Sequence, residues 1–123
     1  MSTAAVHAHA FYRDVARARK LWTIRDSGGY PAPTGRGQRR AQPFWSSLSR
    51  AQRIIKNVPA YAKFEPVEIS WDDFVTTWIP KLDRSGYLVG VNWSGANATG
   101  YDLDTEWVRR CVQIVIDDLQ GSS

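Results

Sequence analysis

Cysteine is almost absent from this chain of 123 residues, which contains a single one, Cys111. One cysteine excludes an internal disulfide and any metal cluster built from cysteines. Long apolar runs are also missing, since no stretch reaches the ~18–20 residues of a membrane helix. The N-terminal region lacks the apolar segment of a signal peptide. These absences predict a cytoplasmic protein with no membrane partner.

Catalytic and metal-binding patterns are equally scarce. The two histidines, His7 and His9, are two positions apart in an expected helix, so they face different sides and are poorly placed to share a metal ion. Cys111 falls within an apolar helical stripe, which favours a buried small side chain over a nucleophile. The glycines around residues 35–37 lack the Gly-Lys-Ser/Thr ending of a phosphate-binding loop. The sequence therefore predicts no enzyme, no cofactor and no metal.

The composition predicts one folded domain. Hydrophobic residues make up 43% of the chain and charged residues 23%, which are ordinary values for a globular protein. A chain of this length buries roughly two thirds of its unfolded surface, which is enough for one core. We expect a single domain over residues 1–120 and a flexible tail over residues 121–123.

The hydrophobic patterning predicts an α+β protein with the element order α-β-β-α-β-α-β-α. Because strands and helices do not alternate regularly, we expect a small mixed, mostly antiparallel sheet of about four strands with helices packed on it. Three apolar stripes, in residues 71–82, 89–91 and 108–116, should share one core. Strand 39–45 should return as the hairpin partner of strand 21–24, and Pro80 should kink or end the third helix near Ile79. The expected helices are 4–20, 48–57, 71–79 and 105–120, and the expected strands are 21–24, 39–45, 66–69 and 86–93.

Five short segments form a recognisable pattern: 22–28 (WTIRDSG), 44–47 (FWSS), 67–71 (VEISW) with Phe74, 78–80 (WIP) and 90–95 (GVNWSG). Together they resemble a known bacterial family, the domain-of-unknown-function family 2750. The resemblance spans roughly residues 10–116, and its most specific parts are the Trp-Ile-Pro and Asn-Trp pieces. It implies a small bacterial α+β domain and implies no catalytic residues.

Without a catalytic pattern, the sequence favours a non-enzymatic binding module, such as an immunity-like or adaptor protein that recognises a protein partner. The candidate surface combines aromatic and polar loop residues with the basic side of helix 48–57, because exposed aromatics and arginines often dominate interfaces. The alternative is a purely structural role, in which Trp45 and Trp93 are buried strand ends and Asp102 accepts a hydrogen bond in a turn or helix cap. The candidate partner-binding residues are Trp45, Arg50, Arg53, Asn92, Trp93, Tyr101 and Asp102.

The charge distribution supports a second hypothesis, nucleic-acid binding. Residues 1–56 hold eleven Lys and Arg against two acidic residues, whereas residues 57–123 hold five against ten. A basic half can contact phosphates, here through Arg36, Arg39 and Arg40, while Trp22 and Trp45 stack on bases. The two halves can equally neutralise each other on folding, and no known nucleic-acid-binding signature is present.

Overall fold

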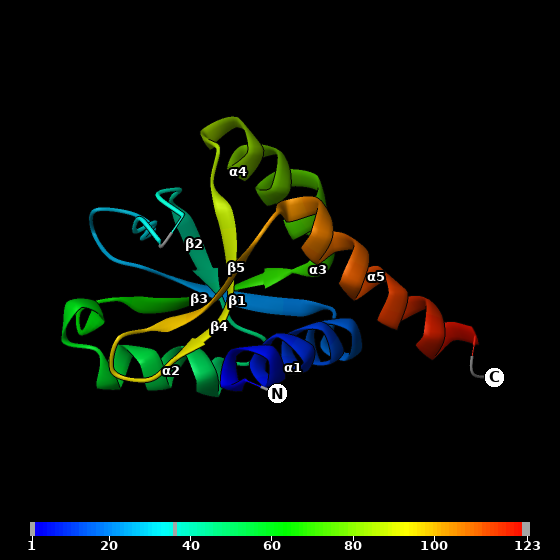
Figure 1. The fold of residues 1–123 in the computed structure, drawn as a ribbon, viewed down its shortest axis with the longest axis horizontal. Coiled ribbons are helices and arrows are strands. Elements are labelled where there is room, and N and C mark those ends of the chain that lie inside the picture. The colour runs from blue at the N-terminus through cyan, green and yellow to red at the C-terminus, as the bar shows by residue number, and fades with distance from the viewer. Residues whose placement is uncertain (1, 36, 122–123) are drawn as a thin grey trace.

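The structure, a computed structural model, describes residues 2–35 and 37–121, and it has the α+β architecture that the sequence predicts (Figure 1). The predicted phosphate contact of Arg36 and the predicted tail residues 122–123 lie outside the described residues. Gly121, assigned to the tail, instead ends the last helix. The helical elements are α1 (Thr3–Ala18), α2 (Leu48–Asn57), η1 (Pro59–Tyr61), α3 (Trp71–Asp73), η2 (Phe74–Trp78), α4 (Ile79–Ser85) and α5 (Thr105–Gly121). The strands are β1 (Lys20–Arg25), β2 (Ala41–Phe44), β3 (Glu65–Ser70), β4 (Leu88–Ser94) and β5 (Thr99–Leu103).

The strands form two small sheets instead of the one expected. β1 pairs antiparallel with β3, while β4 lies between a parallel β2 and an antiparallel β5. One antiparallel bridge joins the sheets: the Trp22 amide donates to the Trp45 carbonyl at 2.8 Å, and the Trp45 amide donates to the Trp22 carbonyl at 2.7 Å.

The predicted hairpin between the first two strands is wrong. Apart from the Trp22–Trp45 bridge, β2 pairs with β4 and not with β1. All four residues of β2 are buried. A strand of this kind needs both of its faces covered, and the place next to the apolar strand β4 in the interior provides that cover. The long segment between β1 and β2 leaves the chain free to make this parallel pairing, because it imposes no hairpin register.

A fifth strand, β5, was not predicted. It pairs with β4 across a polar loop, with Val91 opposite Tyr101 and Gly90 opposite Asp102. Its residues are exposed or only half-buried, so the segment lacks the apolar alternation by which a strand is recognised in a sequence. The strand forms because β4 offers it a free edge.

The third helical segment continues through Pro80 to Ser85, which corrects the expected end near Ile79. A wider π-helical turn, η2, precedes the proline, and the Ile79 amide donates to the Phe74 carbonyl. Pro80 then lies in the first turn of α4, where its missing N–H leaves no helical bond unmade. The expected capping role of Ser70 is confirmed, since its Oγ accepts from the Asp73 amide at 3.0 Å.

Two hydrophobic clusters hold the fold together. The larger cluster joins α1, the α3–α4 segment, β4 and α5, and confirms that the three apolar stripes share a core. The smaller cluster lies between α2 and the junction of the two sheets. The larger cluster includes Trp71, Phe74, Trp78, Leu82, Val89, Val91, Val112 and Ile116, and the smaller one includes Trp22, Ile24, Trp45, Ile54, Val58 and Trp93.

The Trp93 ring makes Gly90 indispensable in β4. A Cβ at Gly90 would lie 2.4 Å from Cε2 of Trp93, and one at Gly100 would lie 2.9 Å from its Cδ1. We therefore expect Gly90→Ala to lower the free energy of unfolding by about 1–3 kcal/mol through overpacking. In a Trp93→Leu background, denaturant titration should show a much smaller cost for the same change. Equal costs in both backgrounds would mean that the ring is not the cause.

Candidate partner-binding site

Three of the seven predicted contact residues are buried: Trp45, Asn92 and, with 6% of its surface exposed, Trp93. The assignment of Trp45 and Asn92 to a recognition surface is wrong. The Trp45 side chain is 0% exposed and Asn92 is 1% exposed. The Trp45 indole Nε1 donates to the Trp93 carbonyl at 2.9 Å. Trp45 therefore joins β2 to β4 inside the smaller cluster, and a partner protein cannot reach it.

Asn92 holds the elements around the site together through its side-chain hydrogen bonds. Its backbone has φ +50°, a left-handed conformation that Asn tolerates better than most residues. Its Oδ1 accepts from the Ser46 amide at 2.9 Å, and its Nδ2 donates to Ser46 Oγ and to the His7 carbonyl, each at 3.0 Å. These bonds tie β4, the start of α2 and the N-terminal half of α1 together.

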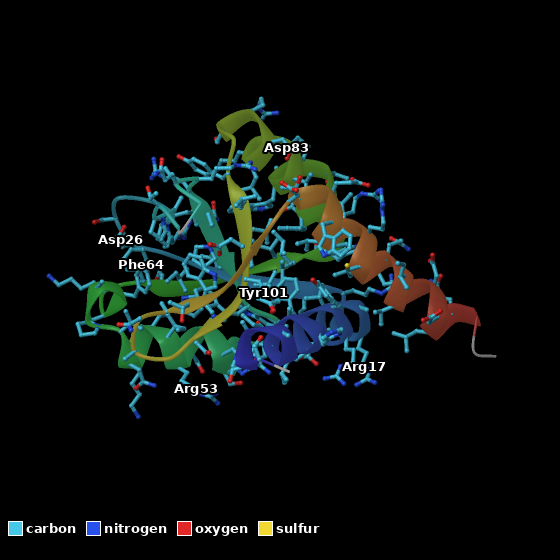
Figure 2. The ribbon with its side chains drawn as sticks, in the orientation of Figure 1. Arg17, Asp26, Arg53, Phe64, Asp83 and Tyr101 are labelled. Carbon is cyan, nitrogen blue, oxygen red and sulfur yellow. The ribbon has the colours of Figure 1, made fainter. Side chains whose placement is uncertain are left out.

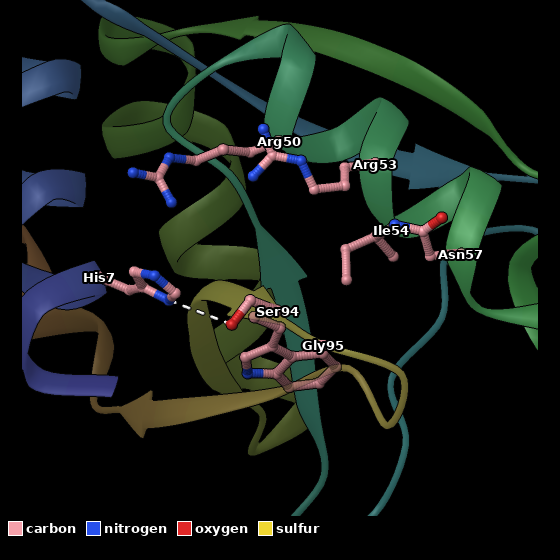
Figure 3. Close-up of a pocket in the computed structure, with 8 residues that line it drawn as sticks. His7, Arg50, Arg53, Ile54, Asn57, Ser94 and Gly95 are labelled. Carbon is pink, nitrogen blue, oxygen red and sulfur yellow. Dashed lines mark hydrogen bonds between the residues drawn. The ribbon is translucent and has the colours of Figure 1, made fainter. Parts of the chain in front are cut away.

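The elements tied by Asn92 border a small pocket (Figure 3). Arg50, Arg53 and Asn57 line it from one side of α2, as the three-residue spacing of the arginines predicts. Ile54 and Trp93 supply its apolar part. The remaining lining residues are His7, Ser94 and Gly95.

His7 was not predicted as a site residue. Its Nδ1 lies 3.1 Å from Ser94 Oγ (Figure 3), and this contact depends on the packing of α1 against the end of β4. No local sequence signal marks His7, because it precedes Ser94 by 87 positions. The polar composition of loop 94–97 was the one usable signal, and that loop does contribute Ser94 and Gly95.

The pocket is electropositive. None of the ion pairs between described side chains involves Arg50 or Arg53. Burial lowers the pKa of the His7 imidazole, and the positive charges of Arg50 and Arg53 lower it further. A neutral His7 beside two arginines leaves a site that favours an anion carrying a hydrogen-bond acceptor.

The lowered pKa of His7 is testable by NMR titration. We expect its imidazole to titrate below its ordinary pKa, and its pKa to rise in Arg50→Gln/Arg53→Gln because one of the two causes is removed. An unchanged His7 titration in this variant would show that the arginines do not act on the ring.

The lowered pKa of His7 also predicts how the stability of the fold changes with pH. Because the folded-state pKa is lowered, the unfolded chain takes up the proton first, so the contribution of His7 is present above about pH 6.5. It is lost as the pH falls through the folded-state pKa. His7→Gln should therefore lose less stability than the wild type between about pH 7.5 and about pH 5.5 in denaturant titrations.

A second, wider hollow is a groove between residues 33–35 and 37–39 and the β4–β5 hairpin. Tyr101, 41% exposed, and the half-buried Asp102 line it together with one edge of Trp93. The Trp93 Nε1 donates to Asp102 Oδ1 at 2.9 Å, and burial raises the pKa of that carboxyl. Of the seven predicted residues, Trp45 and Asn92 are buried supports, Arg50 and Arg53 line the pocket, and Tyr101 and Asp102 line the groove. The seventh, Trp93, is buried and has an edge in both hollows.

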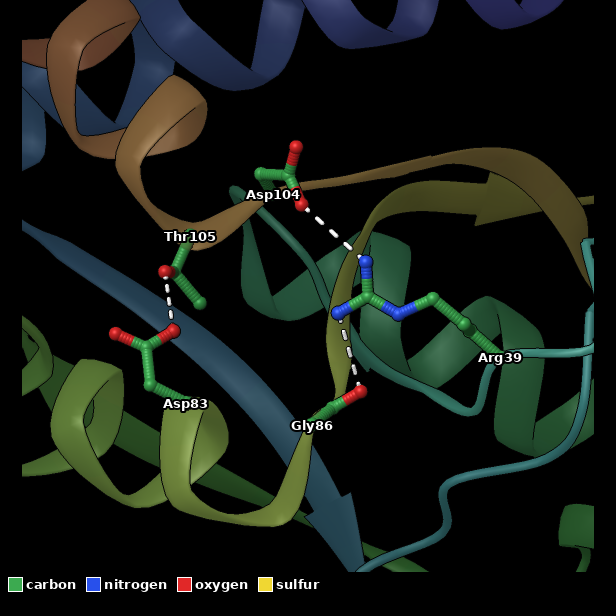
Figure 4. A network of polar contacts seen from close by, with 5 residues as sticks. All are labelled: Arg39, Asp83, Gly86, Asp104 and Thr105. Carbon is green, nitrogen blue, oxygen red and sulfur yellow. Dashed lines mark hydrogen bonds and ion pairs between the residues drawn. The ribbon is translucent and has the colours of Figure 1, made fainter.

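The two described arginines that were predicted to contact nucleic acid, Arg39 and Arg40, interact with other groups of the fold. Arg39 donates to Asp104 Oδ1 at 3.5 Å and to the Gly86 carbonyl at 3.1 Å, next to the Thr105–Asp83 hydrogen bond (Figure 4). Arg40 donates to the Ala32 carbonyl at 2.6 Å and its guanidinium lies 5.0 Å from the Tyr87 ring centre. Base stacking on Trp22 or Trp45 is wrong, because both rings are buried.

Cys111 is half-buried instead of fully buried, which corrects the expectation for the apolar stripe. Burial raises the pKa of its thiol, which makes the thiolate scarce at neutral pH. Among residues 2–35 and 37–121, no three His, Cys, Asp or Glu side chains are grouped to hold a metal ion. Within the same ranges, no helix has the length and apolarity that crossing a bilayer requires.

A comparison with protein families matches residues 8–111 to the family described as "Protein of unknown function (DUF2750)". The chain belongs to this family. The match confirms the resemblance read from the tryptophan-containing segments, all of which lie within the matched range. Comparisons with curated proteins and with solved structures found no match. DUF2750 membership agrees with the α+β fold, and the family description assigns no activity.

Proposed function

We propose that this DUF2750 protein is a non-enzymatic binding module of the bacterial cytoplasm that recognises an acidic segment of a protein partner, in an immunity-like or adaptor role. The observation that carries the proposal is the electropositive pocket in which Arg50 and Arg53 have no carboxylate partner among the described residues. The single cysteine and the lack of long apolar runs support the cytoplasmic assignment.

The size and lining of the pocket favour a carboxylate side chain. The pocket is small, so it suits a compact group such as a single carboxylate. The two guanidinium groups and Asn57 can donate hydrogen bonds to its oxygens, while Ile54 and Trp93 contact its aliphatic part. Arginine pairs well with carboxylates because its planar fork matches their geometry.

Nucleic-acid binding is the second candidate, and the arrangement of α1 and α2 favours it. Arg17 of α1 and Arg53 of α2 project from the same side of the molecule (Figure 2). Such a surface contacts phosphates without sequence preference, and its affinity falls steeply with salt. Arg39 and Arg40 donate hydrogen bonds within the chain, which argues against phosphate contacts through the loop before β2.

A pull-down from source cells with matched charge reversals tests the proposal. Arg50→Glu/Arg53→Glu removes the pocket cations, and Arg13→Glu/Arg17→Glu makes the same charge change on the exposed side of α1. We expect one protein to be recovered by the wild type and by the α1 variant but not by the pocket variant. Exposed changes of this kind alter stability by only about 0.5 kcal/mol each.

Two results would contradict the proposal. In one, no recovered protein depends on Arg50 and Arg53. In the other, nucleic acid is recovered, is released by salt, and is lost equally from both variants, which would support the second candidate.

A further inference from the structure

Helix α5 carries an apolar stripe that faces solvent. Trp107 is 54% exposed and Ile114 is 55% exposed, with the half-buried Cys111 between them. Positions 107, 111 and 114 follow the i, i+4, i+7 spacing of one helix side. The opposite side of α5 is buried in the larger cluster through Val108, Val112 and Ile116.

Trp107 is the exception among the six tryptophans. The other five are at most 9% exposed, as expected for rings that bury large apolar areas. The C-terminal half of α5 extends past the end of α1 and away from the body of the fold (Figure 1). Residues 117–121 are all exposed, so a second helix can lie along the C-terminal part of this stripe, while at its N-terminal part Trp107 and Cys111 adjoin Tyr12 of α1.

The charged residues Arg110 and Asp117 beside the stripe are positive in one half of α5 and negative in the other, so two antiparallel copies of the helix would pair opposite charges. Arg110, whose side chain is 63% exposed, lies in the N-terminal half of α5, and Asp117 follows two turns later on the same side. Within the chain, these residues have only exposed helical neighbours: Arg110 lies 3.8 Å from Glu106, and Asp117 accepts from Gln113 at 3.0 Å. In two parallel copies of α5 this charged flank would face the opposite flank of the stripe, whereas in two antiparallel copies it faces itself and places Arg110 against Asp117.

We infer that α5 binds a second copy of this chain as an antiparallel helix pair, with a two-fold axis near Ile114. In this register each Ile114 meets its equivalent, and Arg110 of each copy faces Asp117 of the other. Trp107 lies over Gly121 of the second copy, where no side chain obstructs the ring.

The proposed dimer is separate from the cation pocket, since none of the stripe residues lines that pocket. A contact that is one helix wide is smaller than a typical stable interface, which buries about 800 Å² per partner. We therefore expect association in the micromolar range, with the two pockets left open.

Sedimentation equilibrium on the whole chain from about 1 to about 300 µM tests the interface. The wild type should shift from monomer to dimer, and acrylamide quenching of tryptophan fluorescence should decrease with concentration as Trp107 becomes covered. Ile114→Lys should remain monomeric. Val6→Lys places the same charge on an apolar residue of α1 that is 49% exposed, and it should dimerise like the wild type.

Charge exchange tests the antiparallel register. Arg110→Asp and Asp117→Arg should each weaken association by about tenfold or more, and the double variant should restore it, because each new pair is again opposite in sign. Arg13→Asp on α1 is the matched control. A wild type that stays monomeric, a dimer that survives Ile114→Lys, or a double variant without restored association would each overturn the inference. Circular dichroism of every variant confirms that the chain is folded.

Discussion

Phe74→Ala is expected to lower the free energy of unfolding by about 3–5 kcal/mol, because it removes a fully buried aromatic ring from the centre of the larger cluster. The Phe74 ring lies 5.1 Å from Phe44 in an edge-to-face arrangement and 5.5 Å from Trp71 in a stacked one, measured between ring centres. Its removal leaves a cavity that α5 and β4 cannot fill without moving, and the lost ring contacts add to the cost.

Denaturant titration measures this loss, and Thr77→Ala provides the matched control. Thr77 lies in the same π-helical turn as Phe74 but is exposed, so its replacement should change stability by only about 0.5 kcal/mol. An unchanged midpoint for Phe74→Ala would contradict the placement of this ring. A large effect of Thr77→Ala would attribute the loss to the π turn itself.

Trp45→Ala is expected to cost a similar about 3–5 kcal/mol. The ring is fully buried, and its Nε1 satisfies the carbonyl of Trp93. The same residue makes the backbone bridge that joins the two sheets. Truncation therefore leaves a cavity and an unpaired buried carbonyl at the junction between β2 and β4.

Trp45→Phe separates the two contributions. Phenylalanine fills most of the volume but cannot donate to the Trp93 carbonyl, so this variant should lose about 1–3 kcal/mol. Both losses are measurable by thermal or denaturant unfolding. A partner that binds the folded Trp45→Phe variant as well as the wild type would agree with a structural role for Trp45. Wild-type stability of both variants would refute the burial.

The candidate site was predictable only where its residues are local in the sequence. Arg50 and Arg53 share a helix side by their spacing, and the polar loop after β4 is visible from its composition. His7 is joined to them through Asn92, which donates to its carbonyl, and through its contact with Ser94. Such long-range contacts leave no trace in spacing.

Exposure was the property that the sequence predicted least well. Trp45, Trp93 and Trp107 are chemically equivalent, yet Trp45 and Trp93 are buried and Trp107 is exposed. A tryptophan at a strand end and one in the first turn of a helix give the same local signal, since either can face a core or solvent. Only the packing of the neighbouring elements decides between these outcomes.

By itself, the sequence determined the α+β class, the positions of most helices and strands, the cap at Ser70 and the three apolar stripes of the larger core, because periodicity and capping are local properties. The tertiary structure alone decided the parallel pairing of β2 with β4, the edge strand β5 and the passage of the helix through Pro80. Each of these depends on a neighbour distant in the chain or on the helical turn before the proline. The same holds for the pocket, because its charge comes from α2 and its shape from α1 and β4.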